Sequence, residues 1–146
     1  MKRNKFHAIK TTVDGYTFDS KAEAARWLDL KLLERAGKII GLKRQVPFPL
    51  CVNGHLITTY VADYTYTDAE TGEIVTEDCK SPATMTPEFR LKMKLLSALH
   101  GINVSIHMTG KPLWVLDASR GRWKRATRRP RSRPTSKRGG GSPASF

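Results

Sequence analysis

Residues 39–80 contain three extended segments that are separated by two turn signals. The first segment, 39–50, carries two prolines in its second half, and a proline in a strand favours the edge of a sheet or a bulge because it has no N–H to donate. Asn53-Gly54 is typical of a two-residue hairpin turn, and a polar loop at 68–73 follows the second segment. This pattern predicts a three-stranded antiparallel meander.

The residues before the meander predict a helix over about 21–36. Ser20 and Glu23 have the spacing of a capping box, in which each side chain accepts a hydrogen bond from the backbone N–H of the other residue. A short hairpin at 13–16 precedes this helix. Ala24, Leu28 and Leu32 share one apolar face of the helix, with Ala25, Trp27 and Leu33 beside it. We expect this face to pack on the core, and Trp27 to be a core residue.

A second helix is predicted after the meander. Thr86 is a preferred N-cap residue and Pro87 suits the first helical position, and the helix is expected to run to about His100, where Gly101 ends it. An alternating apolar segment at 102–106 then predicts a strand, and the apolar residues beyond it predict another short one. The order is therefore helix, three-stranded meander, helix, strand, and we expect residues 1–118 to form one domain of the α/β class.

Positive charge is concentrated at the C-terminal end of the chain. The 146 residues carry 26 Lys and Arg against 13 Asp and Glu, for a net charge of +13. Ten of the basic residues and none of the acidic ones lie in 119–146, which leaves 16 basic against 13 acidic residues elsewhere. A segment so rich in Arg, Pro, Ser and Gly buries little apolar surface, so we expect a disordered tail. Its charge favours nucleic acid as a partner, with a solvating role as the alternative.

Composition excludes several classes of protein. No apolar run approaches the roughly 18 residues that a membrane span needs, so we expect no membrane association. The charged N-terminus is not followed by the apolar segment of a secretory signal. Cys51 and Cys79 lack the spacing of a metal-binding pair, so we expect free thiols in a reducing compartment and a cytoplasmic location.

Three charged residues are predicted to converge on the second hairpin of the meander. If Thr67 pairs with Ile74, antiparallel register places Asp63 opposite Asp78. The alternation of side chains along a strand puts Lys80 on the same face as Asp78. Opposed carboxylates repel unless a cation lies between them, and their oxygens suit Mg²⁺ or Mn²⁺. The alternative is a solvent-facing hairpin on which Asp78 and Lys80 form an ordinary surface ion pair.

These residues carry a resemblance to a known family. Ala62-Asp63 followed by Asp78-Cys79-Lys80 resembles the bipartite signature of the PD-(D/E)xK nuclease superfamily, and the predicted element order is similar to its restriction-endonuclease-like core. Residues 18–23 resemble the segment that carries an additional active-site Glu in Holliday-junction resolvases and phage endonuclease I proteins. Residues 4–109 as a whole resemble a family of small phage-encoded proteins of this superfamily. Gln45 resembles a polar position of some members.

The resemblance implies a role for each matching residue. Asp63 and Asp78 would hold one or two Mg²⁺ or Mn²⁺ ions together with the backbone carbonyl of Cys79. Glu23 would complete the metal shell directly or through water, although helix capping alone also explains a Glu at this position. Lys80 would orient the attacking water or help to deprotonate it. Glu77, adjacent to Asp78, is expected to face away from this patch. It is a weaker candidate for the metal-binding role that we assign to Asp78.

The function implied is that of a metal-dependent endodeoxyribonuclease acting on branched DNA such as Holliday junctions during recombination, in the cytoplasm of a bacterial host. Symmetric cutting of two strands would call for a homodimer. The alternatives are a nicking or flap nuclease and a non-catalytic nucleic-acid-binding module. The residues that we expect to contact DNA are Arg90, Lys92 and Lys94 on the second helix and Arg120, Arg122, Lys124, Arg125, Arg128 and Arg129 in the tail.

Overall fold

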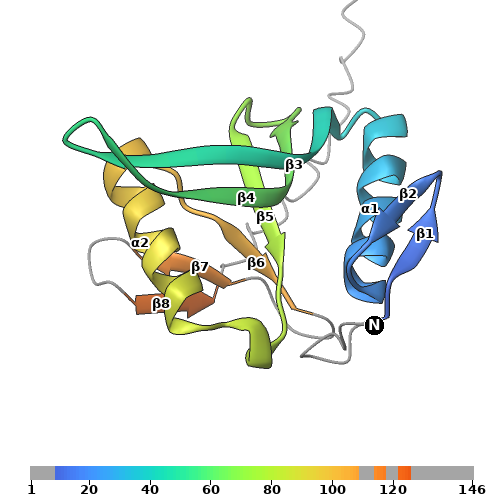
Figure 1. The fold of residues 1–146 in the computed structure, drawn as a ribbon. Coiled ribbons are helices and arrows are strands. Elements are labelled where there is room, and N and C mark those ends of the chain that lie inside the picture. Colours follow the sequence, from blue (N-terminus) through green and yellow to red (C-terminus); the bar gives the residue numbers. More distant parts are fainter. Residues whose placement is uncertain (1–8, 109–113, 118–121, 126–146) are drawn as a thin grey trace, which may run out of the picture.

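A computed structural model describes residues 9–108, 114–117 and 122–125 of the chain (Figure 1). These residues form a six-stranded sheet in the order β3-β4-β5-β6-β7-β8, a separate hairpin of β1 and β2, and two α-helices. The elements are β1 (Thr11–Val13), β2 (Tyr16–Phe18), α1 (Lys21–Arg35), β3 (Ile39–Val52), β4 (His55–Asp68), β5 (Ile74–Cys79), the 3₁₀-helix η1 (Pro82–Thr84), α2 (Pro87–His100), β6 (Ser105–His107), β7 (Trp114–Asp117) and β8 (Arg122–Arg125).

The predicted meander is confirmed. Strands β3, β4 and β5 pair antiparallel, and β3 lies at the edge of the sheet, where its two prolines are tolerated. The hairpin between β3 and β4 turns at Asn53 and Gly54, both with positive φ, as an Asn-Gly turn requires. Strand β6 runs parallel to β5, and α2 makes the crossover between them. The α/β class and the order helix, meander, helix, strand are therefore correct.

Helix α2 begins and ends as predicted. The Thr86 hydroxyl accepts a hydrogen bond from the backbone N–H of Phe89 at 3.2 Å, and Gly101 follows the helix with a φ of 66°. The helix buries Phe89 and Met93 against the strands. The core cluster on this side of the sheet consists of Leu50, Tyr60, Ala62, Phe89, Met93, Leu96, Val104 and Ile106.

The packing of helix α1 agrees with the prediction for Ala24 and Trp27 but not for Leu28 and Leu32. Leu28 and Leu32 are 44% and 61% exposed, and the buried residues of the helix are Ala24, Trp27 and Leu30. The reason is the opposing aromatic surface, because the Trp27 ring packs against the rings of Phe18 and Tyr64 and turns the helix toward them. The second core cluster consists of Phe18, Ala24, Trp27, Leu30, Ile39, Tyr64, Tyr66 and Cys79.

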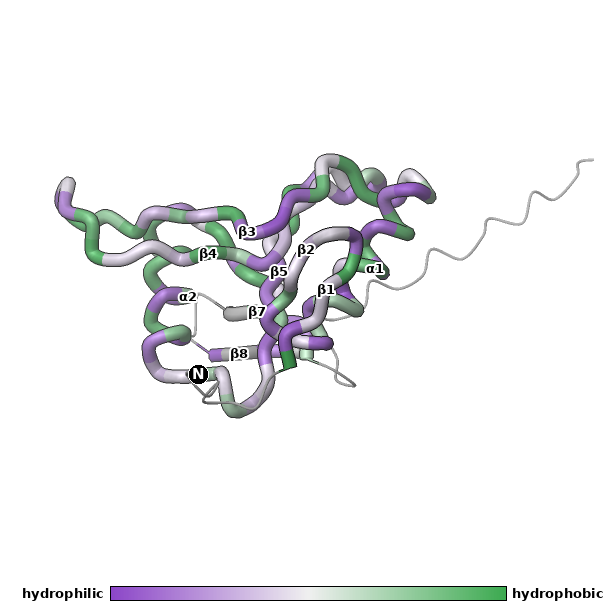
Figure 2. Tube along the Cα trace, turned by 45° about the vertical axis from the view of Figure 1, so that its right-hand side comes forward, coloured by the Kyte–Doolittle hydropathy of each residue, from purple (hydrophilic) through white to green (hydrophobic). Residues whose placement is uncertain are grey.

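Strand β5 runs between the two helices (Figure 1). Figure 2 shows hydrophilic stretches on β3 and β5 in the middle of the molecule, whereas hydrophobic residues continue into the projecting end of the β3–β4 hairpin. Strand β4 crosses from one core cluster to the other: Tyr60 and Ala62 pack with α2, and Tyr64 and Tyr66 pack with α1. Asp63 therefore lies at the point where β4 passes from one cluster to the other.

The predicted boundary of the tail is wrong at one point. Residues 122–125 form β8, which pairs antiparallel with β7, although we expected disorder from about residue 119. An Arg-rich segment has little strand propensity of its own, and its strand structure comes from pairing with the edge of the sheet. The other residues of the predicted tail, 119–121 and 126–146, lie outside the described part of the chain. Among the described helices, none combines the length and the apolar content that crossing a membrane requires.

Candidate active site

The register of the second hairpin brings Asp63 and Asp78 together. Thr67 pairs with Ile74, as predicted, and the same register continues to Tyr64 and Glu77, the residues directly beside the two aspartates. The Asp63 carboxylate extends across this end of the ladder, where its Oδ2 accepts a hydrogen bond of 2.8 Å from the backbone N–H of Cys79. The two carboxylates are therefore neighbours on adjacent strands.

Asp78 is held on two sides. It is 2% exposed, and its Oδ2 accepts a hydrogen bond of 2.7 Å from the Tyr60 hydroxyl. The Lys80 Nζ lies 3.1 Å from Oδ1, which confirms that Lys80 shares a face with Asp78. Apart from this ion pair, Oδ1 is buried without a hydrogen-bond partner among the described residues. Lys80 is itself held 4.5 Å above the centre of the Phe89 ring, which limits where its ammonium group can go.

Burial and close spacing make it less favourable for these carboxylates to be ionised together. Burial, followed by the charges of Asp78 and Glu23, raises the pKa of Asp63 to about 8. Burial also raises the pKa of Asp78, while Lys80 and Tyr60 act in the opposite direction. The metal-free site therefore favours a proton on Asp63, and a bound cation would remove the need for it.

Glu23 is the third carboxylate of this group. Burial raises its pKa first, and the charges of Asp19 and Asp78 add to the effect. In α1 the Ser20 hydroxyl accepts a hydrogen bond of 3.2 Å from the backbone N–H of Glu23, which is the Ser20 half of the predicted capping box. This half uses no atom of the Glu23 side chain, so capping does not account for the carboxylate that interacts with Asp63 and Asp78.

The Glu23 backbone is fixed from the sheet. The Tyr64 hydroxyl donates a hydrogen bond of 2.8 Å to the Glu23 carbonyl, so the residue next to Asp63 holds the start of α1. One turn further along α1, the Arg26 guanidinium donates two hydrogen bonds, of 2.8 and 2.7 Å, to the carboxylate of Glu77. Glu77 is 1% exposed. It faces away from Asp63 and Asp78, as predicted, and its carboxylate also accepts a hydrogen bond from the Tyr66 hydroxyl.

Gln45 is the strained residue of the site. It lies on β3 between Arg44 and Val46, which pair with Tyr64 and Ala62, so Gln45 stands opposite Asp63. Its φ of 53° is in the left-handed region, and its amide Nε2 donates a hydrogen bond of 3.4 Å to Asp63 Oδ1. Backbone strain of this kind is retained where the surrounding structure enforces it, often at functional sites.

The donor set fits a hard cation. No group of three His, Cys, Asp and Glu side chains within the described ranges is close enough to form a complete metal centre. Two neighbouring carboxylates, a third in electrostatic contact and a buried oxygen without a hydrogen bond nevertheless provide the anionic oxygen ligands that Mg²⁺ and Mn²⁺ prefer. Cys51 and Cys79 are free thiols, as expected, and the Cys79 side chain packs in the α1 cluster.

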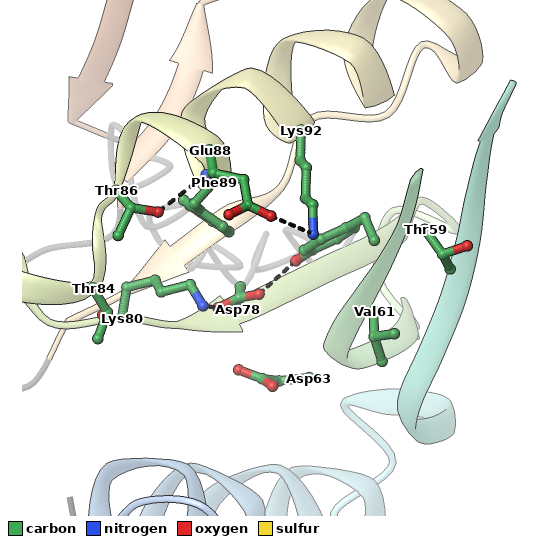
Figure 3. Close-up of a pocket in the computed structure, with 11 residues that line it drawn as sticks. Thr59, Val61, Asp63, Asp78, Lys80, Thr84, Thr86, Glu88, Phe89 and Lys92 are labelled. Carbon is green, nitrogen blue, oxygen red and sulfur yellow. Dashed lines mark hydrogen bonds and ion pairs between the residues drawn. The ribbon is translucent and has the colours of Figure 1, made fainter. Parts of the chain in front are cut away.

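A cavity of about 450 Å³ opens from the carboxylates toward α2 (Figure 3). Its floor contains Asp63, Asp78 and Lys80, and Lys92 reaches into it from the helix. The complete lining is Thr59, Tyr60, Val61, Asp63, Asp78, Lys80, Thr84, Thr86, Glu88, Phe89 and Lys92. The three predicted DNA contacts of α2 are therefore not equivalent, since Arg90 and Lys94 are exposed and belong to no part of this lining.

The remaining predicted DNA contacts are only partly described. Arg122 and Lys124 are exposed on β8. The Arg125 side chain and the residues Arg120, Arg128 and Arg129 lie outside the described part of the structure. Sequence reasoning missed Tyr60 and Arg26, whose partners are 18 and 51 residues away; the signal available for Tyr60 was its place three residues before Asp63.

The comparisons with known proteins give one result. A protein-family model described as "Protein of unknown function (DUF1064)" matches residues 3–115. No curated protein and no solved structure matches the chain.

Proposed function

The chain belongs to the DUF1064 family, and we propose that it is a metal-dependent endodeoxyribonuclease of the PD-(D/E)xK type. The observation that carries this proposal is the meeting of Asp63, Asp78 and Lys80 where the pairing of β4 with β5 ends, with Glu23 in electrostatic contact from α1. Carboxylates that can hold a divalent cation, together with a lysine beside them, can support metal-dependent hydrolysis of a phosphodiester.

The fold supports the same assignment. A helix, a three-stranded meander, a crossover helix and a parallel strand follow one another, in the order that resembles the restriction-endonuclease-like core. The Asp78-Cys79-Lys80 half of the signature lies at the end of β5, with Lys80 directly after the strand, and Ala62-Asp63 lies on the neighbouring strand β4. The two halves of the motif are thus adjacent in space, as a joint role in one site requires.

Each residue has a defined task in this proposal. Asp63 and Asp78, with Glu23 and the carbonyl of Cys79, would hold Mg²⁺ or Mn²⁺, which when bound polarises the phosphate and acidifies the attacking water. The Lys80 ammonium, fixed between Asp78 and the Phe89 ring, would stabilise negative charge that develops on the phosphate oxygens. Tyr60 and Gln45 would hold the two aspartates in their orientations.

The substrate and the assembly belong to the proposal too. Branched DNA such as a Holliday junction is the preferred substrate, a homodimer would allow symmetric cutting of two strands, and the cytoplasm of a bacterial host is the expected location. A non-catalytic nucleic-acid-binding module is the second candidate, and the lack of a complete three-ligand centre among the described residues favours it.

A cleavage assay separates the two candidates. The full chain is incubated with linear duplex, single-stranded and four-way-junction DNA, in Mg²⁺, in Mn²⁺ and in EDTA. We expect cleavage with either metal, no cleavage in EDTA, and a preference for the junction. The Asp78→Asn variant should bind DNA and remain folded by circular dichroism but lose cleavage by orders of magnitude. Cleavage by this variant at the wild-type rate would disprove the proposed site, and binding without cleavage by the wild type would establish the module.

A further inference from the structure

The cavity beside the carboxylates is larger than a metal site needs. Its volume of about 450 Å³ lies within the range of roughly 300–1,000 Å³ that is usual for small-molecule sites. In Figure 3 the carboxylates lie in the middle of the lining, between Thr84 and Thr86 on one side and Thr59 and Val61 of β4 on the other. The first turns of α2 complete the lining. The cavity therefore has room for a chemical group next to the reacting phosphate.

The part of the lining that Val61, Phe89 and Lys92 contribute combines one cation with apolar surface. Lys92 is three-quarters buried and points into the cavity, with Val61 and the Phe89 ring among the apolar lining (Figure 3). An ammonium group beside apolar side chains matches a phosphate that is attached to a sugar, because the cation binds the anion and the apolar groups cover the sugar ring.

The present partner of Lys92 is weakly held. Lys92 Nζ lies 3.4 Å from Glu88 Oε1, and the Glu88 side chain is 79% exposed. An ion pair with a solvent-exposed carboxylate contributes little to stability, since water solvates that carboxylate well. A phosphate that enters the cavity can therefore replace Glu88 as the partner of Lys92 at small cost.

We propose that this cavity is a subsite for one nucleotide of the bound strand, in which Lys92 binds the phosphate next to the scissile one and Val61 and Phe89 contact the sugar. The inference rests on the proposed function, because it takes Asp63 and Asp78 as the position of the scissile phosphate. It also distinguishes the cations of α2: Lys92 makes a specific contact, and Lys94 contributes only general charge.

The pair of variants Lys92→Met and Lys94→Met tests this distinction. Each removes one positive charge from α2, so the loss of general attraction to DNA is matched. Affinity is measured by fluorescence anisotropy on single-stranded and junction DNA, with Ca²⁺ in place of Mg²⁺ to prevent turnover. We expect Lys92→Met to raise Kd about tenfold, as for the loss of one charged hydrogen bond, and Lys94→Met to raise it less than about twofold. Equal effects of the two substitutions would overturn the proposal.

A neutral phosphate analogue locates the contact. Single methylphosphonates are placed at the phosphates on either side of the cleavage position mapped for the wild type. At one of these positions the methylphosphonate should weaken DNA binding by the wild type and by Lys94→Met. It should not weaken binding by Lys92→Met any further, because the partner of that phosphate is already gone. The same penalty in all three proteins would overturn the proposal. If no DNA is cleaved, the proposed function fails, and the anisotropy comparison still decides whether Lys92 differs from Lys94.

Discussion

Asp63 is a carboxylate whose proton affinity the fold has changed strongly. Burial and two neighbouring negative charges raise its pKa to about 8, compared with about 3.9 in an unfolded chain. Between these values the folded protein binds a proton that the unfolded chain does not, so protonation stabilises the fold below about pH 4 and this contribution is lost as the pH rises through 8.

The metal-free protein should therefore become less stable between about pH 4 and pH 8. The free energy of unfolding should fall by up to about 1.4 kcal/mol per pH unit from this group, and Mg²⁺ should restore stability at the upper end by binding the charged carboxylates. Thermal unfolding in EDTA across this range measures the effect, and the Asp63→Asn variant should show a flatter profile. A wild-type profile no steeper than that of Asp63→Asn would contradict the raised pKa.

Glu23 offers a second test at the scale of one side chain. The Ser20 half of the cap uses the backbone N–H of Glu23, so Glu23→Gln should leave the melting temperature within a degree or two of the wild type. It removes a charge near Asp63 and Asp78, and Mg²⁺-dependent cleavage should fall about 10- to 100-fold, as for the loss of groups that support a metal. Lost stability with retained activity would instead assign Glu23 to capping.

At the scale of elements, α1 is tied to the sheet by residues adjacent to the candidate ligands. Tyr64 and Glu77 are the chain neighbours of Asp63 and Asp78, and they hold the Glu23 carbonyl and the Arg26 side chain respectively. Alternation along each strand thus directs one residue to the site and the next to α1. The position of Glu23 depends on these ties.

Breaking the pair of Arg26 and Glu77 should destabilise the protein strongly. Arg26→Met leaves the Glu77 carboxylate buried with the Tyr66 hydroxyl as its remaining hydrogen-bond donor among the described residues, and we expect a loss of about 3 kcal/mol in urea denaturation. The double variant Arg26→Met/Glu77→Leu should recover much of this loss. Lys31→Met is the control, because the side chains of its pair with Glu34 are 35% and 32% exposed and its loss should cost less than about 1 kcal/mol. A similar loss in both single variants would refute the special role of the buried pair.

At the scale of the whole molecule, the basic residues after β8 are predicted to add affinity for DNA without taking part in cleavage. Strand β8 belongs to the sheet, so a truncation that spares the fold must follow Ala126. It removes six of the ten basic residues of 119–146. If half of the six contact phosphates, the slope of log K against log salt should fall in magnitude by about 3, at roughly 0.9 per contact. An unchanged slope would assign these residues a solvating role.

The sequence by itself determined the features that follow from local rules. Turn residues and strand periodicity predicted the meander and the register of Thr67 with Ile74, and this register placed Asp63, Asp78 and Lys80 together. Capping residues predicted both ends of α2. These signals are encoded within a few neighbouring residues, which is why they can be recognised without the fold. The metal, the DNA substrate and the dimer stay predictions.

Only the tertiary structure decided which faces meet. Leu28 and Leu32 follow the helical period but are exposed. The reason is that Trp27 packs against the rings of Phe18 and Tyr64, and this contact turns its own face of the helix toward the core. The bond from Tyr60 to Asp78 and the pair of Arg26 with Glu77 join residues far apart in the chain. Such contacts depend on how whole elements pack, and no local pattern encodes the partner of a buried polar group.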